Sequence, residues 1–197
     1  MVSVKSQMLK LGTKAPAFTL KNSINDQMMS LEENVGKNGT LVFFICNHCP
    51  FVIHVRDQFK LLYEEYSVKG ISFIAINSNS TETHPQDGPE YMRSLAKEIE
   101  WDFPYLFDET QEVAMLYNAA CTPDFFLFDN ELKLYYRGQL DSSRPKNNIP
   151  VTGGDLRNAM NSLLQGKAAP EDQKPSIGCN IKWKPGNEPQ YFMDSII

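Results

Sequence analysis

The stretch Thr40–Pro50, TLVFFICNHCP, decides the fold of this 197-residue chain. Its first six residues carry no charge and are rich in β-branched and aromatic types, which predicts a buried strand. Pro50 suits the first turn of a helix, where its missing N–H costs nothing, and apolar residues follow at helical spacing to about residue 68. Cys46 and Cys49 therefore lie at a strand-to-helix turn. The positive end of the helix dipole favours a thiolate there, and we expect that thiolate at Cys46, accessible from outside.

A second buried strand over residues 71–77 follows this helix, which Gly70 ends, so strand, helix and strand form one βαβ unit. An N-terminal hairpin is expected where a strand within residues 10–20 meets residues 28–31. The later elements follow in chain order: a long polar loop over 78–89, a helix over 90–99, a strand over 103–107, a helix over 110–119, a hairpin of strands over 125–128 and 132–137, and a helix over 155–165.

Composition and charge limit the classes of function. A chain of this length fills one domain, residues 1–197, with a core over about 10–166 and an extension over 167–197. The net charge of −5, without a basic stripe, argues against nucleic acid or an anionic membrane as a partner. No run reaches the roughly 20 apolar residues of a membrane span, and the first twelve residues lack a signal-peptide core. We expect a cytoplasmic monomer or homodimer, in which four cysteines are more often catalytic or metal-binding than structural.

The extension contains scattered prolines and no evident periodicity, yet it is rich in apolar side chains. These are Ile177, Cys179, Ile181, Trp183, Tyr191, Phe192, Ile196 and Ile197. So many apolar side chains predict that the extension packs back on the domain.

Cys121-Thr122-Pro123 stands before the strand over 125–128. A CxxC after one strand and Thr-Pro before a late strand, together with the opening GTKAPAFTL, resembles the redoxin branch of the thioredoxin superfamily, which includes the peroxiredoxin-like (AhpC/TSA-like) proteins. The resemblance implies a thioredoxin-like α/β fold, with a mixed central sheet flanked by helices. It also implies that Pro123 is cis, and that the backbone of Thr122 binds a substrate chain by strand addition.

Peroxiredoxins carry a Pro-x-x-x-Thr-x-x-Cys motif and a later arginine that activates the peroxide. Matching Cys49 to that cysteine puts Cys46 on the threonine position and Val42 on the proline position. The activating arginine falls at Pro123. The chain thus resembles a peroxiredoxin-like protein converted to dithiol chemistry.

The leading hypothesis is a thiol–disulfide oxidoreductase. Cys46 attacks a substrate disulfide, Cys49 resolves the mixed disulfide, and a thiol electron donor restores the pair, with no cofactor. His48, between the two cysteines, is expected to favour the thiolate and tune its pKa. The strand before the motif contains no carboxylate, so a general base for Cys49 is not identified.

Other interpretations stay open. One is a thiol peroxidase in which Cys49 or Cys46 forms the sulfenic acid. Another is a copper chaperone using the two cysteines and a histidine, although no metal site is assigned. Cys121 is a possible third redox thiol or a packed core residue, and Cys179 a possible relay thiol or a buried anchor of the tail. Asp124 is expected to be exposed near the site, without a role.

Overall fold

The computed structural model describes residues 3–194, so Ile196 and Ile197 lie outside it. Seven strands form the central sheet: β2 (Thr19–Asn22), β3 (Met28–Ser30), β4 (Gly39–Phe44), β5 (Ile71–Asn77), β6 (Tyr105–Phe107), β8 (Asp124–Phe128) and β9 (Leu134–Gly138). Their order in the sheet is β3-β2-β6-β5-β4-β8-β9. β5 is parallel to β4 and β6, whereas β8 runs antiparallel to β4 and β9. The predicted mixed sheet and N-terminal hairpin, β2 with β3, are confirmed.

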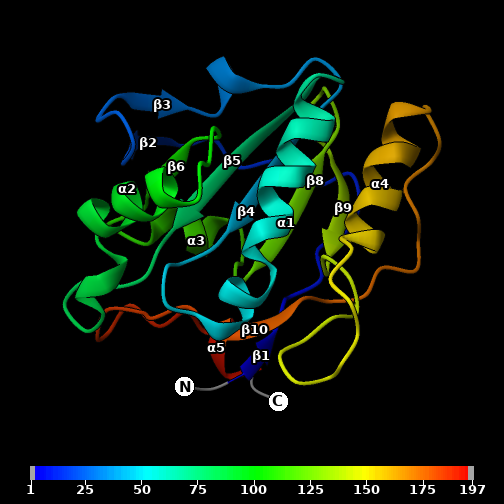
Figure 1. Cartoon of the computed structure of the whole chain (residues 1–197). Coiled ribbons are helices and arrows are strands. Elements are labelled where there is room, and N and C mark those ends of the chain that lie inside the picture. The colour runs from blue at the N-terminus through cyan, green and yellow to red at the C-terminus, as the bar shows by residue number, and fades with distance from the viewer. Residues whose placement is uncertain (1–2, 195–197) are drawn as a thin grey trace.

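Helices lie on both faces of this sheet (Figure 1). They are α1 (Pro50–Ser67), α2 (Pro89–Glu98), α3 (Glu112–Leu116), α4 (Gly154–Leu164) and α5 (Tyr191–Asp194), with short 3-10 turns η1 (Glu32–Asn34) and η2 (Pro85–Asp87). α3 is shorter than the predicted 110–119. Its start is set by Gln111, which has a left-handed backbone, and by the Asp108 carboxylate, which accepts the N–H groups of Val113 and Ala114; at its end, Asn118 is also left-handed.

β4 is buried on both sides because its residues alternate between two cores. Leu41 and Phe43 pack with α1 and α4 in one cluster, whereas Val42 and Phe44 pack with α3 in the other. A strand covered on both faces needs apolar residues at every position, which accounts for the unbroken run before the cysteines.

A second, smaller sheet adjoins the carboxyl end of β4. It consists of β1 (Ser3–Lys5), β10 (Ile177–Asn180) and β7 (Cys121–Thr122), in the order β1-β10-β7. The sequence patterns did not predict these three strands. β10 belongs to the C-terminal extension and pairs antiparallel with β7, with Cys179 opposite Thr122. Ile181 and Trp183, which follow β10, are buried in the main core.

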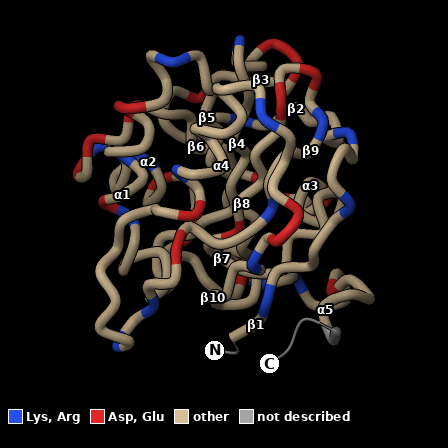
Figure 2. Tube along the Cα trace, turned by 90° about the vertical axis from the view of Figure 1, so that its right-hand side faces the viewer, with Lys and Arg blue, Asp and Glu red and all other residues tan. Residues whose placement is uncertain are grey.

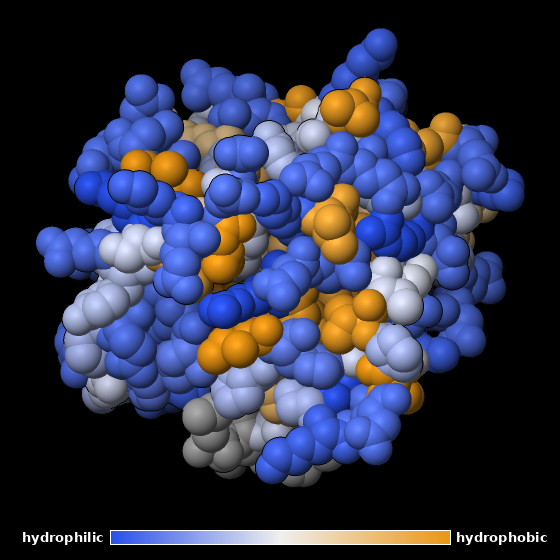
Figure 3. All heavy atoms as spheres, viewed as in Figure 1, coloured by the Kyte–Doolittle hydropathy of each residue, from blue (hydrophilic) through white to orange (hydrophobic). Residues whose placement is uncertain are grey.

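Charged positions of both signs are interspersed along the trace (Figure 2). The face turned toward the viewer in Figure 1 is largely hydrophilic, and its hydrophobic residues form separate patches (Figure 3). Among the helices within residues 3–194, none is long and apolar enough to cross a membrane.

Candidate redox site

The two cysteines occupy the turn that joins β4 to α1. Cys49 is the N-cap of α1, with Pro50 in the first helical position, and Cys46 lies three residues before Cys49, outside the helix. Among the causes that lower the pKa of Cys49 is a hydrogen bond from the backbone N–H of Val52 in the first helical turn. The helix terminus therefore favours a thiolate at Cys49, and the expectation that it acts on Cys46 is wrong.

Both thiols lie against Thr122, the residue before Pro123. Cys46 Sγ is 3.5 Å from Thr122 Oγ1, and Cys49 Sγ is 3.2 Å from the Thr122 carbonyl oxygen, to which its thiol form donates. The Thr122–Pro123 peptide bond is cis, as the resemblance implied. Sequence reasoning thus brought together the residues that do meet in space.

The pKa values of three neighbouring thiols shift in opposite directions. Interactions with the thiols of Cys179 and Cys46 lower the pKa of Cys49. Burial, the hydrogen bond to Cys49 and the nearby Asp87 carboxylate raise the pKa of Cys46. The hydrogen bond to Cys49, followed by burial, also raises the pKa of Cys179. Of these three thiols, Cys49 is therefore the one whose pKa is lowered, and its two neighbours are the ones whose pKa is raised.

All four cysteines are reduced and buried. Cys46 is only 1% exposed and Cys49 is 0% exposed, so the expected accessible thiol is not present in this state. The extension contributes to this cover, because β10 pairs with Thr122, the residue whose backbone the resemblance assigns to a substrate chain. A hollow beside Pro123, lined also by Phe51 and Ile177, has a volume of only about 20 Å³.

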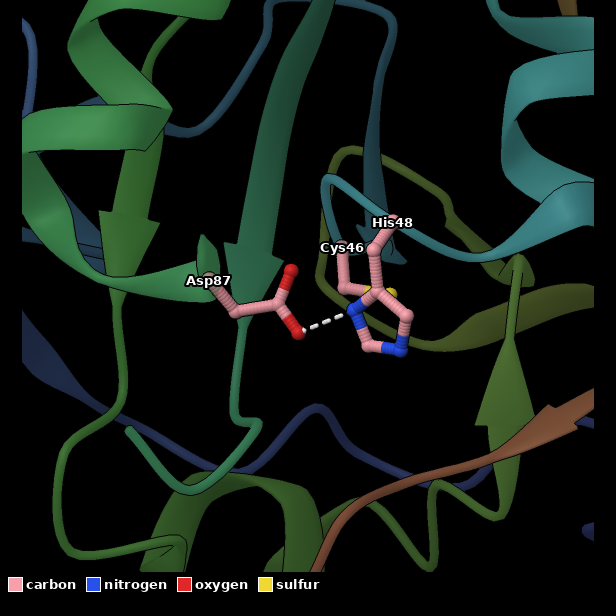
Figure 4. Close-up of side chains that lie close together, drawn as sticks. All are labelled: Cys46, His48 and Asp87. Carbon is pink, nitrogen blue, oxygen red and sulfur yellow. Dashed lines mark ion pairs between the residues drawn. The ribbon is translucent and has the colours of Figure 1, made fainter. Parts of the chain in front are cut away.

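A buried ion pair lies next to Cys46. His48 Nδ1 is 2.6 Å from Asp87 Oδ2, and Figure 4 shows the two side chains pointing toward each other with Cys46 beside the imidazole ring. Asp87 is 0% exposed and also accepts hydrogen bonds from the backbone N–H of Asn47, at 2.8 Å, and from Asn79 Nδ2, at 2.7 Å. These bonds fix the carboxylate, which in turn holds the imidazole.

Asp87 is the site residue that sequence reasoning missed. It ends η2 in the polar loop over 78–89, about 40 residues after the cysteines. The same loop is tied to the extension, because Lys182 donates its N–H to Asn79 Oδ1 and accepts from the N–H of Ser80, both at 2.8 Å. The loop and the extension therefore close over the site as one hydrogen-bonded unit.

The remaining candidates are packed into the core. Cys121 is fully buried, its Sγ is 3.6 Å from the Pro123 carbonyl oxygen, and burial raises its pKa. Asp124 is also fully buried, which corrects the expectation of an exposed carboxylate, and it forms a 3.2 Å ion pair with buried Arg137. Arg137 in turn donates to the carbonyl oxygen of Asn118, at 2.7 Å.

The chain is similar to a known protein family and to several known proteins. A model of the AhpC/TSA family matches residues 11–137. Thiol-disulfide oxidoreductase ResA of Bacillus thuringiensis subsp. konkukian is 24% identical over 132 residues, which are 66% of this chain and 70% of ResA. The crystal structure of an uncharacterized conserved protein from Geobacillus kaustophilus has a TM-score of 0.93 and 55% identity, covering 94% of this chain and 98% of that chain.

A more distant structure identifies the fold. The thioredoxin domain of a thiol-disulfide oxidoreductase from Bacteroides vulgatus has a TM-score of 0.61 at 20% identity, covering 80% of this chain and 99% of that chain. The predicted thioredoxin-like α/β fold is confirmed by this match. Since the family model spans well over half of the sequence, the chain belongs to the AhpC/TSA family, within the redoxin branch of the thioredoxin superfamily.

Proposed function

We propose that this protein is an oxidoreductase acting on thiol and disulfide groups, which exchanges electrons between a disulfide-containing substrate and a thiol donor through Cys46 and Cys49. The observation that carries the proposal is that both thiols lie against the same residue at the N-terminus of α1: Cys46 Sγ is 3.5 Å from Thr122 Oγ1 and Cys49 Sγ is 3.2 Å from the Thr122 carbonyl oxygen. Two sulfur atoms held against one residue need little movement to form a disulfide bond. The similarity to ResA, named a thiol-disulfide oxidoreductase, supports the same reaction class.

The exchange requires an open state. In the closed state burial is the largest cause of the raised pKa of Cys46, so displacement of β10 both admits a substrate and restores thiolate character to this sulfur. The Cys46 thiolate then attacks one sulfur of the substrate disulfide and releases the other as a thiolate. The Cys49 thiolate attacks Cys46 in the mixed disulfide, which releases the second substrate thiolate and leaves the Cys46–Cys49 disulfide. A donor with two thiols reduces this bond and restores the pair.

His48 and Asp87 are proposed to manage the proton of Cys46. Ligand atoms of the three residues lie within 4.8 Å of one another. Asp87 Oδ2, at 2.6 Å from His48 Nδ1, orients the imidazole ring beside Cys46. The pair therefore supplies a base for Cys46, rather than for Cys49.

Titration in glutathione buffers tests the proposed pair. The reduced protein, equilibrated with an increasing fraction of oxidised glutathione, should form the Cys46–Cys49 disulfide in a single two-electron step. It should also accelerate the reduction of insulin disulfides by dithiothreitol, and Cys46→Ser should abolish that acceleration while the matched variant Cys121→Ser retains it. A wild-type protein that forms no Cys46–Cys49 disulfide, or a Cys46→Ser variant with full activity, would refute the proposal.

A metal-binding module is a second candidate, favoured by one observation. Cys46, His48 and Asp87 place ligand atoms close enough to share an ion. His48 Nδ1 lies 2.6 Å from Asp87 Oδ2, and among the described residues neither ring nitrogen of His48 has a hydrogen-bond partner. Stoichiometric zinc or copper that survives dialysis of the wild type and is lost in Asp87→Asn would support the metal site.

A further inference from the structure

We propose that Cys179 is a third redox thiol, which takes over the disulfide bond of Cys49 from Cys46. The inference rests on the proposed function, because the Cys46–Cys49 disulfide must form first. It assigns a reacting group to the C-terminal extension, outside residues 11–137 that match the family model.

β10 places Cys179 at the reacting sulfur atoms. Cys179 is the register partner of Thr122, whose carbonyl oxygen is 3.2 Å from Cys49 Sγ. Cys179 lies in the same buried cluster as Cys46 and Cys49, and its thiol is the largest cause of the lowered pKa of Cys49. Cys49 therefore has one thiol on each side, from the CxxC turn and from β10.

The close approach of β10 depends on the residue before Cys179. A Cβ atom on Gly178 would lie 2.0 Å from the Thr122 carbonyl oxygen and 2.7 Å from its carbonyl carbon, far inside van der Waals contact. Only glycine allows the two backbones this close. Gly178 thus lets the backbone of β10 approach Thr122, and this approach brings Cys179, the next residue, close to the reacting sulfur atoms.

Burial alone does not account for this placement. Cys121 is a core cysteine in the same small sheet, yet its thiol is directed to the Pro123 carbonyl oxygen. Cys179, by contrast, lies in the buried cluster that contains Cys46 and Cys49, whereas Cys121 lies in another cluster. A thiol packed beside the reacting sulfur atoms can form a disulfide bond with one of them.

The proposed step is an internal exchange that needs no further oxidant. Starting from the Cys46–Cys49 disulfide, the Cys179 thiol loses its proton and attacks Cys49 Sγ. The Cys49–Cys179 bond forms, the Cys46–Cys49 bond breaks, and Cys46 leaves as a thiolate that takes up the proton. One disulfide bond is present before and after the step, so the cluster of three cysteines is neither oxidised nor reduced by it. The exchange returns Cys46 to its reduced form and ties β10 covalently to the start of α1.

Peptide mapping of the full-length protein tests the exchange. Trypsin releases one peptide, residues 38–56, that contains both Cys46 and Cys49, and another, ending at residue 182, that contains Cys179. Wild type, Cys46→Ser, Cys49→Ser and Cys121→Ser are equilibrated in glutathione buffers of increasing oxidised fraction, quenched with acid, alkylated, digested and measured by mass spectrometry. Cys121→Ser is the matched control, because it removes a buried thiol of the same sheet.

The expected result is a linked pair of these peptides in wild type and in Cys121→Ser, with a loss of about tenfold or more in Cys49→Ser. In Cys46→Ser, which lacks the first disulfide, oxidised glutathione forms a mixed disulfide with Cys49 and Cys179 displaces glutathione from it, so the same link should be most abundant because Cys46 no longer competes for Cys49. If wild type forms the Cys46–Cys49 disulfide without any link to Cys179, the relay is refuted and the proposed function stands. A link of equal yield in Cys49→Ser refutes the assignment to Cys49. If no Cys46–Cys49 disulfide forms in wild type, the proposed function fails, and the relay with it. If Cys46→Ser does not fold, the yield of the linked peptides in Cys46→Ala and in wild type tests the relay instead.

Discussion

Replacing Gly178 with valine should open the site. The added Cβ would stand 2.0 Å from the Thr122 carbonyl oxygen, which belongs to a rigid backbone, so β10 cannot keep its present register. The segment that covers Cys46 must then move away for a larger fraction of the time. Gly154→Ala is the matched control, because the nearest atom to its new Cβ is 3.3 Å away and belongs to the side chain of Thr152.

The size of the effect follows from the contacts that β10 would lose. β10 pairs with β7 over Cys179 and Asn180, and the N–H of Ile181 donates to the Ala120 carbonyl oxygen at 3.1 Å. Loss of two such backbone hydrogen bonds costs about 2 kcal/mol, at roughly 1 kcal/mol each. That raises the open fraction by about 30-fold, since 1.4 kcal/mol corresponds to a factor of ten. Opening also relieves the burial that raises the pKa of Cys46, which increases the reactivity further.

The assay is the alkylation rate of reduced Cys46 by iodoacetamide, followed on the peptide over residues 38–56. Gly178→Val should react about 30-fold faster than wild type, and Gly154→Ala about as fast as wild type. Urea unfolding of each variant separates local opening from global destabilisation. A folded Gly178→Val protein that reacts at the wild-type rate would show that β10 does not control access to the cysteines.

Three further outcomes are expected. In the Gly178→Val background, Asp87→Asn should lower the pKa of Cys46, because the substitution removes a negative charge that raises this pKa. The pH dependence of the alkylation rate measures the pKa, and an unshifted profile contradicts the prediction. Burial raises the pKa of Cys121, so above about pH 9 this thiol loses its proton in the unfolded chain but keeps it in the folded protein, and the unfolding free energy falls by about 1.4 kcal/mol per pH unit. In Cys121→Ala the unfolding free energy, measured with urea between about pH 8 and 10, should therefore fall less steeply with pH. An equally steep fall would exclude the effect. Asp124→Asn leaves buried Arg137 without a counter-charge and should cost about 3–5 kcal/mol of unfolding free energy, whereas a loss below about 1 kcal/mol would show that the pair is not charged.

The central sheet could be predicted because its strands and helices carry local signals. β4, β5 and β8 are rich in apolar residues, and α1 begins at a proline. β10 was missed although a signal exists: Cys179, Ile181 and Trp183 are buried and alternate with the less buried Asn180 and Lys182. That period-two pattern is short and lies between prolines, so local propensity does not distinguish it from a loop. Its pairing with β7 is a long-range contact, which no local pattern encodes.

Asp87 could not have been found from its own segment. An acidic residue in a polar loop is normally solvated, and here the carboxylate is buried only because its partners come from elsewhere: Asn47 and His48 from the cysteine turn, and Asn79 from the start of the loop. Sequence reasoning sought the buried carboxylate on the strand before the cysteines. The structure supplies it from the loop after β5, on the side of Cys46.

The motif itself contains the reason why its two thiols differ. A proline in the first helical position makes the preceding residue, Cys49, the N-cap, so the helix terminus acts on this sulfur. Cys46 lies instead beside the carboxylate of Asp87, which favours its neutral form. The lowered pKa therefore belongs to the sulfur of Cys49, which lies in the same buried cluster as Cys46 and Cys179 and is 0% exposed. A disulfide can pass among these three atoms in the closed state, whereas electrons can enter or leave the protein only when the strand that carries Cys179 moves.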